Sequence, residues 1–426
     1  MILTNARILT FDGENRVLDS GSVEVGADGT IGLVRSGRSI DADAIDLHGR
    51  LLMPALINCH THLYSALARG LRLPGPAPAD FPAILKKLWW RLDRALNEED
   101  VYASALIGLI DSAKCGVGTL IDHHSSPNAC AGSLDRIEQA FREVGLRGAT
   151  CYEVSDRNGK RGAQEGIREN VRYLERVRAG AQVGAMFGLH ASFTLSDRTL
   201  RECAEANQSF DGGFHVHVAE DRCDRQAVRR LCRFGVLDEK AIAAHCVHVT
   251  AAERGMLGRR RVNVSHNPQS NCNNAVGIAN LAALGRAGAC VGLGSDGCTP
   301  RMWDEFKTAY HVQKLRARDP RVSGDDVLEA AFRNSGAIVN RIWGVPVGRI
   351  ETGAKADLLV LDYFPPAPMG SDNLFGHLLF GISNAPVDAL MVDGRWVVRD
   401  GRLVNVDERR VAEKAAARAK ALWERL

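Results

Sequence analysis

The sequence predicts an α/β fold: a closed (β/α)8 barrel of the TIM type with a small β-sandwich domain formed from both ends of the chain. Two observations lead to this prediction. The middle of the chain alternates short apolar, β-branched runs with longer helical stretches, which is typical of repeated β-α units around a parallel sheet. Both ends instead carry short strands separated by Gly and Asp turns. The 426 residues are enough for one large barrel and a smaller unit.

Eight apolar runs in the middle of the chain are expected to form the barrel strands. They are Leu51–Cys59, Gly118–Asp122, Leu146–Tyr152, Val183–Leu189, Gly213–Val218, Ala241–Ala244, Arg261–Ser265 and Ala289–Ser295. Helices are expected in the gaps, among them Glu99–Lys114, Thr199–Asn207 and Arg301–Leu315. A doubly wound open sheet is the alternative, but no G-x-G-x-x-G motif follows any of these strands.

The two ends of the chain are expected to pair into one β domain. Ile2–Leu9 and Ile31–Val34 predict strands near the N-terminus, and Asp393-Gly394 between two apolar runs predicts a hairpin near the C-terminus. The chain is thereby divided into residues 1–53, the N-terminal part of the β-sandwich domain; residues 54–347, the barrel; and residues 348–426, the C-terminal part of the β-sandwich domain with a C-terminal helix.

Composition and charge are those of an ordinary globular protein. The chain is 45% hydrophobic and 25% charged, which excludes disorder and a fibrous architecture. Its 54 basic and 51 acidic residues are spread along the chain, so we expect a small-molecule ligand and no nucleic-acid partner. Without a basic leader or a run of roughly 18 apolar residues, the sequence predicts a cytoplasmic protein with no membrane partner. Eleven cysteines without a C-x-x-C pair indicate reduced thiols.

Reactive side chains gather at the ends of the expected strands, which is where the active site of a parallel barrel lies. Most of the 13 histidines are among them. In chain order these residues are His60, His62, Asp122, His123, His124, Glu153, His190, His215, His217, Glu220, His245, His266 and Asp296. Histidines scattered through a core would not concentrate at strand ends, so the pattern predicts one functional site at this end of the barrel.

Four of these residues form a candidate metal site. His60 and His62 lie at i and i+2 of an extended chain, so both side chains project to the same side and can reach one ion. His217 and Asp296 add a third imidazole and a carboxylate, a shell that suits Zn²⁺ and also Fe²⁺ with one position open. We therefore expect one divalent metal, with Zn²⁺ ahead of Fe²⁺. His215 competes with His217 for the ligand role, but His217 lies nearer the strand end.

Motifs around these residues extend over nearly the whole chain. They are Pro54-Ala55-Leu56-Ile57-Asn58-Cys59-His60-Thr61-His62, His217-x-x-Glu220, Ala244-His245-Cys246-Val247-His248, Ser265-His266-Asn267-Pro268-x-Ser270-Asn271, Gly294-Ser295-Asp296-Gly297 and Gly348-Arg349-Ile350-Glu351-x-Gly353. Together they resemble the amidohydrolase superfamily, in particular its cytosine-deaminase and triazine-hydrolase-like branch. Asp122-His123-His124-Ser125-Ser126-Pro127 is most similar to the SsnA-type aminohydrolases of that branch. Ala55 departs from the pattern, because the branch usually has Gly there.

The resemblance implies a hydrolytic mechanism and an assembly. Asp296 would accept the proton of the attacking water, Glu220 would carry it to a ring nitrogen of the substrate, and His245 would orient the water. Superfamily members with two metals usually bridge them with a carboxylated lysine at the end of the fourth strand. That strand ends here at His190, so the resemblance implies one metal per subunit. Barrels of this branch are often dimers, which implies a homodimer.

Five further residues are expected to contact the substrate: His190, His123, His124, Trp90 and His266. One of the adjacent pair His123 and His124 must point away from the site. His266 could instead hold loops together through hydrogen bonds. Trp90 could cap a planar ring or pack against the barrel or a partner subunit.

Three functions are compatible with this site. The leading one is a metal-dependent hydrolytic deaminase of an aminated heterocycle, such as a purine, pterin, pyrimidine or triazine, because an acid such as Glu220 beside the ring nitrogen favours loss of ammonia. The alternative uses the same site to hydrolyse a cyclic amide or another C–N or C–X bond. A non-catalytic metal-binding scaffold would tolerate loss of Glu220 and His245, and this chain keeps both.

Overall fold

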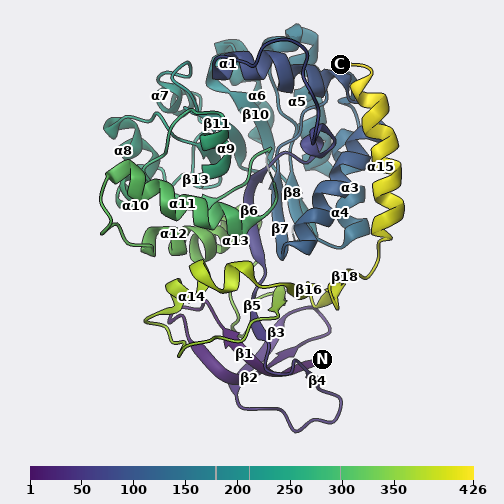
Figure 1. Cartoon of the computed structure of the whole chain (residues 1–426). Coiled ribbons are helices and arrows are strands. Elements are labelled where there is room, and N and C mark those ends of the chain that lie inside the picture. The colour runs from purple at the N-terminus through teal and green to yellow at the C-terminus, as the bar shows by residue number, and fades with distance from the viewer. Residues whose placement is uncertain (178–179, 211, 298) are drawn as a thin grey trace.

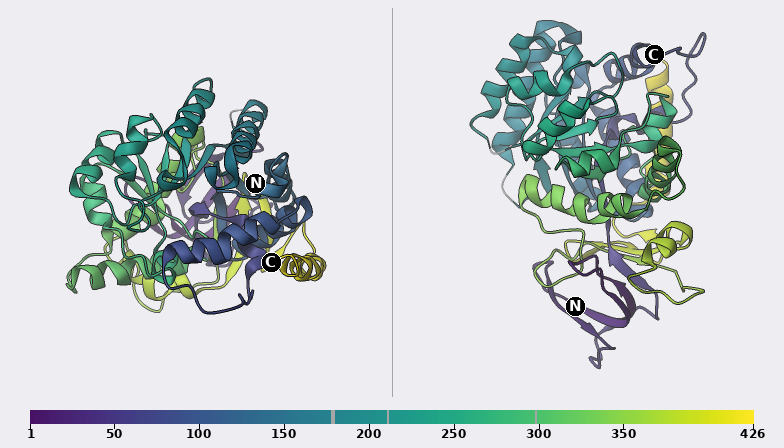
Figure 2. Two further views of the ribbon diagram at one scale, coloured as in Figure 1. Left: turned by 90° about the horizontal axis from the view of Figure 1, so that it is seen from above. Right: turned by 90° about the vertical axis from the view of Figure 1, so that its left-hand side faces the viewer.

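The computed structural model describes residues 1–177, 180–210, 212–297 and 299–426. A barrel surrounded by helices lies above a β sheet that contains the N-terminus (Figure 1). Seen from above, the helices lie around the barrel strands (Figure 2).

Parallel strands form the barrel wall in two hydrogen-bonded runs, β6 to β9 and β10 to β14. They are β6 (Leu56–Thr61), β7 (Val117–Asp122), β8 (Arg147–Thr150), β9 (Val183–Ala185), β10 (Phe187–Ala191), β11 (Phe214–Val218), β12 (Ile242–His245), β13 (Asn263–His266) and β14 (Cys290–Leu293). The fourth position is shared, because β9 pairs with β8 and β10 pairs with β11. The runs meet where the backbone amides of Ser295 and Asp296 donate to the carbonyl of His60, at 3.0 and 2.9 Å. The predicted (β/α)8 barrel is confirmed.

Helices in the connections cover the outside of the barrel. The main ones are α3 (Glu98–Lys114), α4 (Ser133–Val144), α5 (Gly159–Arg176), α6 (Asp197–Asn207), α7 (Ala227–Arg233), α8 (Ala251–Arg259), α10 (Leu281–Arg286), α11 (Met302–Ala317) and α13 (Ser335–Trp343). The three helices named from the sequence match α3, α6 and α11 to within two residues at each end. Helix α3 begins at a capping box, in which the side chains of Asn97 and Asp100 each accept from the other's backbone amide.

The expected strand Leu51–Cys59 is wrong as a single element. The structure divides this run into β5 (Leu51–Pro54), which belongs to the lower sheet, and β6, which belongs to the barrel. The chain changes sheets at Ala55, whose amide donates to the carbonyl of Asp357, while the next amide donates to the carbonyl of Gly116 (both 2.9 Å). Both strands are buried along their whole length. The hydrophobicity of the sequence therefore does not indicate where the chain passes from the lower sheet to the barrel.

Both ends of the chain contribute strands to the lower sheet, whose order is β18-β17-β16-β15-β5-β1-β2-β3, with β4 beside β1. The strands are β1 (Ile2–Leu9), β2 (Val17–Val25), β3 (Ile31–Ser36), β4 (Ile45–Asp46), β15 (Leu358–Leu361), β16 (Val387–Val392), β17 (Arg395–Arg399) and β18 (Arg402–Leu403). The predicted hairpin lies between β16 and β17, where Asp393 and Gly394 have φ of 51° and 73°, as a tight turn requires.

A buried ion pair joins the barrel to the lower sheet. Arg147 on β8 is 2% exposed, and its Nε and Nη2 donate to the two carboxylate oxygens of Asp357 at 2.8 and 3.1 Å. Nη2 also donates to Asp393 at 3.1 Å. A bidentate arginine–carboxylate pair fixes orientation as well as distance, so this contact holds the two parts in one arrangement.

The C-terminal helix α15 (Glu408–Trp423) leaves the lower sheet and runs along the side of the barrel beside α3 (Figure 1). Arg418 of α15 donates from Nε to Asp100 at 3.0 Å, and the indole nitrogen of Trp423 donates to the carbonyl of Leu67 at 2.9 Å. Within the described residues, no helix combines the length and apolar character that crossing a bilayer requires. The ten described cysteines are free thiols.

Candidate active site at the carboxyl ends of the barrel strands

Three imidazole nitrogens and one carboxylate oxygen converge at the carboxyl end of the barrel. The Nε2 atoms of His62 and His217 lie 3.2 Å apart. Asp296 Oδ1 lies 3.0 Å from His62 Nε2 and 3.5 Å from His60 Nε2. Bonds of about 2.0–2.1 Å to a tetrahedral ion would put its ligand atoms about 3.3 Å apart. The spacing therefore fits the four predicted ligands around one ion.

The hydrogen bonds on the other side of each ring leave these nitrogens free to bind an ion. The Nδ1 atom of His62 donates to the carbonyl of His123 at 2.6 Å, and that of His217 donates to the carbonyl of His190 at 2.7 Å. Nε2 of both rings is then a lone-pair donor, as in metal-bound histidines held by a backbone carbonyl. His60 Nε2 is buried and has no hydrogen-bond partner. A divalent cation fits this set of donors.

Burial and charge act in opposite directions on these groups. Burial lowers the pKa of His60 to about 3. It disfavours charge on His62 as well, but the hydrogen bond and charge of Asp296 outweigh burial and raise the pKa of His62 to about 9. Burial also disfavours the charge of Asp296, but its bonds to the two histidines hold its pKa well below the ordinary value. The anionic form of Asp296 is therefore favoured in this site.

A second group of side chains lies against Asp296. His245 Nε2 is 3.5 Å from Glu220 Oε2 and 3.7 Å from Asp296 Oδ2. Burial, together with the charge of Asp296, raises the pKa of Glu220 well above its ordinary value. The shift favours the protonated carboxylic acid, which is the state a general acid needs.

The backbone at these positions adopts left-handed conformations that side chains other than glycine rarely take. Ala219, next to Glu220, has φ of 48°, and His245 and Asp296 have φ of 73° and 58°. Such conformations cost on the order of 1–3 kcal/mol each and persist only where the surroundings enforce them. Their position at or within three residues of the carboxyl ends of β11, β12 and β14 turns the acid–base groups into the site.

One short helix, α9 (Pro268–Asn273), together with its flanking residues, holds all three acid–base groups. Asn271 Oδ1 accepts a hydrogen bond from His245 Nδ1 at 2.8 Å. Ser270 donates to Asp296 Oδ2, and Asn274 Nδ2 donates to Glu220 Oε1 at 3.3 Å. Residues three and four apart share one face of a helix, which explains how three side chains of one turn reach three catalytic groups.

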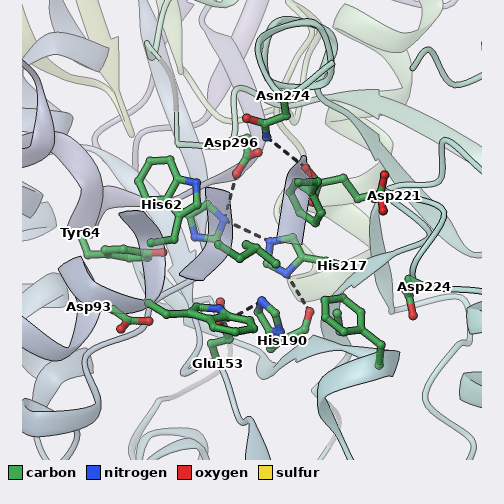
Figure 3. Close-up of a pocket in the computed structure, with 17 residues that line it drawn as sticks. His62, Tyr64, Asp93, Glu153, His190, His217, Asp221, Asp224, Asn274 and Asp296 are labelled. Carbon is green, nitrogen blue, oxygen red and sulfur yellow. Dashed lines mark hydrogen bonds and ion pairs between the residues drawn. The ribbon is translucent and has the colours of Figure 1, made fainter. Parts of the chain in front are cut away.

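A cavity of about 640 Å³, its open mouth included, lies in front of this centre, within the size range of small-molecule sites. Its roof is made by α1 (Phe81–Ile84) and the π-helical turn Leu85–Trp89 that follows. Phe81, Leu85 and Val276 form a hydrophobic cluster there, against which Trp89 and Trp90 pack. Figure 3 shows the polar wall; the lining residues include His62, Tyr64, Asp93, Glu153, His190, Phe193, His217, Glu220, Asp221, Asp224, Asn274 and Asp296.

Comparison with known proteins identifies the family. Residues 51–397 match the model of the amidohydrolase family. The chain belongs to the amidohydrolase family. This amidohydrolase is 32% identical to a 5'-deoxyadenosine deaminase of Methanothermobacter thermautotrophicus, with 95% of this chain and 96% of the relative covered. It is 29% identical to a 5-methylthioadenosine/S-adenosylhomocysteine deaminase of Desulforudis audaxviator, with 100% and 99% covered.

Solved structures share the fold of this amidohydrolase. An adenosine deaminase from Xanthomonas campestris with bound zinc superposes with a TM-score of 0.88 at 21% identity, covering 100% of this chain and 98% of that one. An atrazine chlorohydrolase from Arthrobacter aurescens complexed with zinc superposes with a TM-score of 0.82 at 20% identity, covering 99% of each chain. These likenesses establish the architecture.

The expected substrate residues of this amidohydrolase fall into two groups. His190 and Trp90 line the cavity. His123 lies behind the wall with its ring 5.5 Å from His62 and 4.8 Å from His217, and His123 Nε2 is 3.1 Å from the carbonyls of Leu189 and His215. Of the adjacent pair, His123 is thus the one that faces the metal-binding residues.

His124 and His266 are also absent from the described cavity wall. His124 Nε2 bonds Ser126 Oγ at 2.7 Å, and its ring lies beside those of Tyr64 and Tyr152. His266 is fully buried with neither ring nitrogen hydrogen-bonded. Burial lowers the pKa of both histidines to about 3, so both are neutral.

His215, the alternative to His217 as a metal ligand, contacts His60 and does not reach the place where the four predicted ligand atoms converge. The Nε2 atom of His215 is 2.8 Å from His60 Nδ1. That contact leaves His60 Nε2 for the ion and makes His215 a supporting residue of the kind that orients a metal-binding histidine.

Several residues of the site were not assigned roles from the sequence. Asn271, Asn274 and Asp93 are among them. The only usable indication in the sequence is the spacing of Asn and Ser residues in α9, because this spacing places polar side chains on one face of the helix. Asp93 is the one carboxylate of an otherwise apolar or basic stretch, and a single acid has no periodicity to mark it.

Proposed function

We propose that this amidohydrolase is a metal-dependent hydrolytic deaminase, which replaces the exocyclic amine of an adenosine-like heterocycle by oxygen and releases ammonia. Relatives that align over nearly the whole chain are named as deaminases of 5'-deoxyadenosine, 5-methylthioadenosine and S-adenosylhomocysteine. A neighbour in fold is a guanine deaminase of E. coli, with a TM-score of 0.79 at 18% identity. An aminated purine ring is therefore the substrate class that we favour.

The observation that carries the proposal is the carboxyl group of Glu220, which lines the cavity with Oε2 3.5 Å from His245 Nε2. Attack on the amine-bearing carbon of a purine puts negative charge on the adjacent ring nitrogen, and a positioned acid there lowers the barrier. Glu220 lines the cavity, and its pKa is raised by burial and by Asp296. Amide hydrolysis at the same site would not need an acid beside a ring nitrogen.

The residues then divide the work as follows. His60, His62, His217 and Asp296 would hold one divalent ion, for which we propose Zn²⁺. Such an ion supplies a water whose pKa is lowered toward about 7. Asp296 accepts a proton of the attacking water through the oxygen that faces His245, Glu220 protonates the ring nitrogen, and the proton held by Asp296 then goes to the amine, which leaves as ammonia. His245 donates from Nδ1 to Asn271, so its Nε2 accepts a hydrogen bond from the attacking water and orients it.

The remaining features are proposed from the resemblance. We propose a cytoplasmic homodimer with one metal per chain, divided into residues 1–53 with 348–426 and residues 54–347. Light scattering of the purified protein tests the dimer, and elemental analysis tests the metal and its stoichiometry.

The decisive experiment is ammonia release from a panel of aminated compounds. Metal-loaded protein is incubated with 5'-deoxyadenosine, 5-methylthioadenosine, guanine, an aminopterin ring, cytosine and an aminotriazine, with the Asp296→Asn variant as the blank. We expect release above the blank for at least one adenine nucleoside. Silence across the panel in protein that carries about one metal per chain would refute deamination and favour hydrolysis of a cyclic amide or another C–X bond.

A further inference from the structure

The short helix α9 depends on other parts of the protein for its position. Side chains of this helix and of the residue that follows it hold the three acid–base groups of the site. The contacts are Ser270 with Asp296, Asn271 with His245 and Asn274 with Glu220. A helix of six residues is far below the length of about 12 residues at which a helix becomes stable by itself in water. Whatever holds α9 against the barrel therefore also sets the position of the acid–base groups.

The N-terminus of α9 is not capped by the side chain that precedes it. Asn267 occupies the capping position, but its side chain makes no capping hydrogen bond. Asn267 Oδ1 instead accepts from Ser265 Oγ at 2.9 Å, and Nδ2 lies 3.4 Å from His245 Nε2. Because Pro268 has no amide hydrogen, the amide of Gln269 is the first in the helix that needs an acceptor.

Glu305 supplies that acceptor from another helix. Helices α9 and α11 pack against each other (Figure 1), and Glu305 Oε2 of α11 accepts from the backbone amide of Gln269 at 3.1 Å. A neighbouring side chain usually caps a helix. Here a residue of a second helix does so, which links the position of α9 to that of α11.

The surroundings of Glu305 are otherwise unsuited to a carboxyl group. Glu305 is fully buried, and its Oε1 atom has no hydrogen-bond partner. The other buried residues in the first two turns of α11 are the apolar Met302, Trp303, Phe306 and Ala309. Within the described part of the chain, no basic side chain forms an ion pair with Glu305, and Arg301, one turn earlier, lies 3.3 Å from Asp304 instead.

The cost of burying this carboxyl group indicates that it has a role. Burial, together with the charge of Asp296, raises the pKa of Glu305 well above its ordinary value, which favours the neutral acid. A polar group in an apolar interior is disfavoured unless a hydrogen bond compensates it. Among the described residues, the amide of Gln269 is the one hydrogen-bond donor to this carboxyl group. The contact with α9 is thus the interaction that an apolar side chain at this position could not make.

We propose that Glu305 is a positioning residue of the reaction: from α11 it holds the N-terminal end of α9, and through α9 it keeps the polar side chains of that helix on the acid–base groups. The inference rests on the proposed function for the reaction, and adds a residue that lies outside the described cavity wall. Displacement of a reacting group by about 1 Å can lower a rate by about 100-fold, so a small shift of α9 is enough to impair catalysis.

Variants at Glu305 test this role. Glu305→Met keeps a similar volume and removes the acceptor, so we expect kcat on the best substrate of the ammonia panel to fall about 10- to 100-fold with little change in KM. Glu305→Gln presents the same carbonyl oxygen to the Gln269 amide as the neutral acid does, and should recover most of the kcat that Glu305→Met loses. Wild-type kcat in Glu305→Met, or an equal loss in Glu305→Gln, would overturn the inference.

A control in the same helix separates positioning from general stability. Gln313 is buried, and its Nε2 donates to the carbonyl of Ala279, outside α9, at 2.9 Å. Gln313→Met also removes a buried hydrogen bond of α11 and should lower the free energy of unfolding, but its kcat should stay near the wild-type value. Equal losses of kcat in Gln313→Met and Glu305→Met would show a structural role only and overturn the inference.

A shorter carboxylate replaces Glu305→Met if that variant does not fold. Glu305→Asp is one methylene group shorter, which withdraws the carboxyl group from the Gln269 amide, so kcat should fall in this variant as well. Wild-type kcat in Glu305→Asp would overturn the inference.

Hydrogen exchange measures the position of α9 without a substrate. We expect the backbone amides of residues 269–274 to exchange about tenfold faster in Glu305→Met than in the wild type, the change that loss of one hydrogen bond produces, and at the wild-type rate in Glu305→Gln and Gln313→Met. If no compound of the panel releases ammonia, the proposed function fails, and exchange alone decides whether Glu305 holds α9. Equal exchange of these amides in all four proteins would overturn the inference.

Discussion

The Nε2 atoms of His62 and His217 lie 3.2 Å apart, and neither can donate a hydrogen bond to the other while both rings are neutral. Each ring keeps its hydrogen on Nδ1, where it is bound to a backbone carbonyl. Two lone pairs at this distance repel unless a cation lies between them. Asp296 Oδ1, 3.0 Å from His62 Nε2, is a third acceptor at the same place. A metal ion between these atoms would remove the repulsion. Without the metal, a proton on His62, whose pKa is raised to about 9, takes its place.

Removal of one of these lone pairs should abolish metal binding. We expect about one divalent ion per chain in the purified protein and less than about a tenth of that in His217→Ala, because a shell of four protein ligands with one removed loses most of its affinity. His311→Asn, at an exposed position of α11, is the matched control and should keep its metal. Elemental analysis provides the measurement, and full metal content in His217→Ala would contradict the assignment.

The sequence sufficed for those residues whose positions follow from the barrel topology. His60, His62, His217 and Asp296 lie at or just beyond the carboxyl ends of three strands, and all parallel strands end at the same rim, so their convergence could be predicted without coordinates. Asn271 and Ser270 could not be assigned in this way, since their roles depend on where a short helix lies over the rim. The division at Ala55 was also inaccessible, because two consecutive buried strands present one unbroken apolar run.

Removing the acid function of Glu220 should affect catalysis but not metal binding. Glu220→Gln keeps the shape and the contact with Asn274 but has no proton to deliver, so we expect kcat to fall about 10²–10⁴-fold, the usual contribution of a positioned general acid. Steady-state kinetics on the best substrate of the panel measures this, with metal content determined in parallel. Full activity with normal metal content would remove Glu220 from the mechanism.

Asn271 should act through His245. Because Asn271 Oδ1 accepts the hydrogen on His245 Nδ1, it fixes the tautomer that leaves Nε2 facing Glu220. We expect Asn271→Ala to lower kcat about 10²-fold with a smaller change in KM, as for loss of one preorganised polar group.

The conservative variant distinguishes this positioning role from a loss of structure. Asn271→Asp retains an acceptor at the same place and should recover most of the lost kcat, whereas Asn271→Leu has a similar volume but no acceptor and should not. A purely steric role predicts recovery in both variants. Asn273→Ala, on the exposed side of the same helix, should have near wild-type kcat. If Asn271→Ala retained full kcat, His245 would not depend on this contact.

The ion pair between Arg147 and Asp357 should contribute strongly to stability. Arg147→Met leaves Asp357 without its cation at a site where both side chains of the pair are 2% exposed, so we expect the free energy of unfolding to fall by about 3–5 kcal/mol. Urea denaturation measures the change. Arg409→Met breaks a pair whose arginine is 91% exposed and should cost less than about 1 kcal/mol; similar losses in the two variants would rule out a special role for the buried pair.

Asp224 should make the protein less stable as the pH rises through the weakly acidic range. Its carboxyl group is 4% exposed, and burial raises its pKa from 3.8 to about 6. The folded state therefore holds this proton more tightly than the unfolded state. The resulting stabilisation is fully present below about pH 4 and is lost as the pH rises to about 6, with a total on the order of 3 kcal/mol for a shift of about two units.

Asp224→Asn removes this titration but keeps an oxygen that can accept from the Ala219 amide, which now donates to Asp224 Oδ2 at 2.9 Å. We therefore expect Asp224→Asn to gain stability relative to the wild type between pH 4 and 6.5, as measured by urea denaturation at several pH values. Asp221→Asn is the matched comparison, since the backbone bond from Cys223 outweighs partial burial and lowers the pKa of Asp221. Asp221→Asn should therefore be less stable than the wild type, whereas Asp224→Asn should be more stable. Parallel plots of the free energy of unfolding against pH for all three proteins would exclude Asp224 as the titrating group.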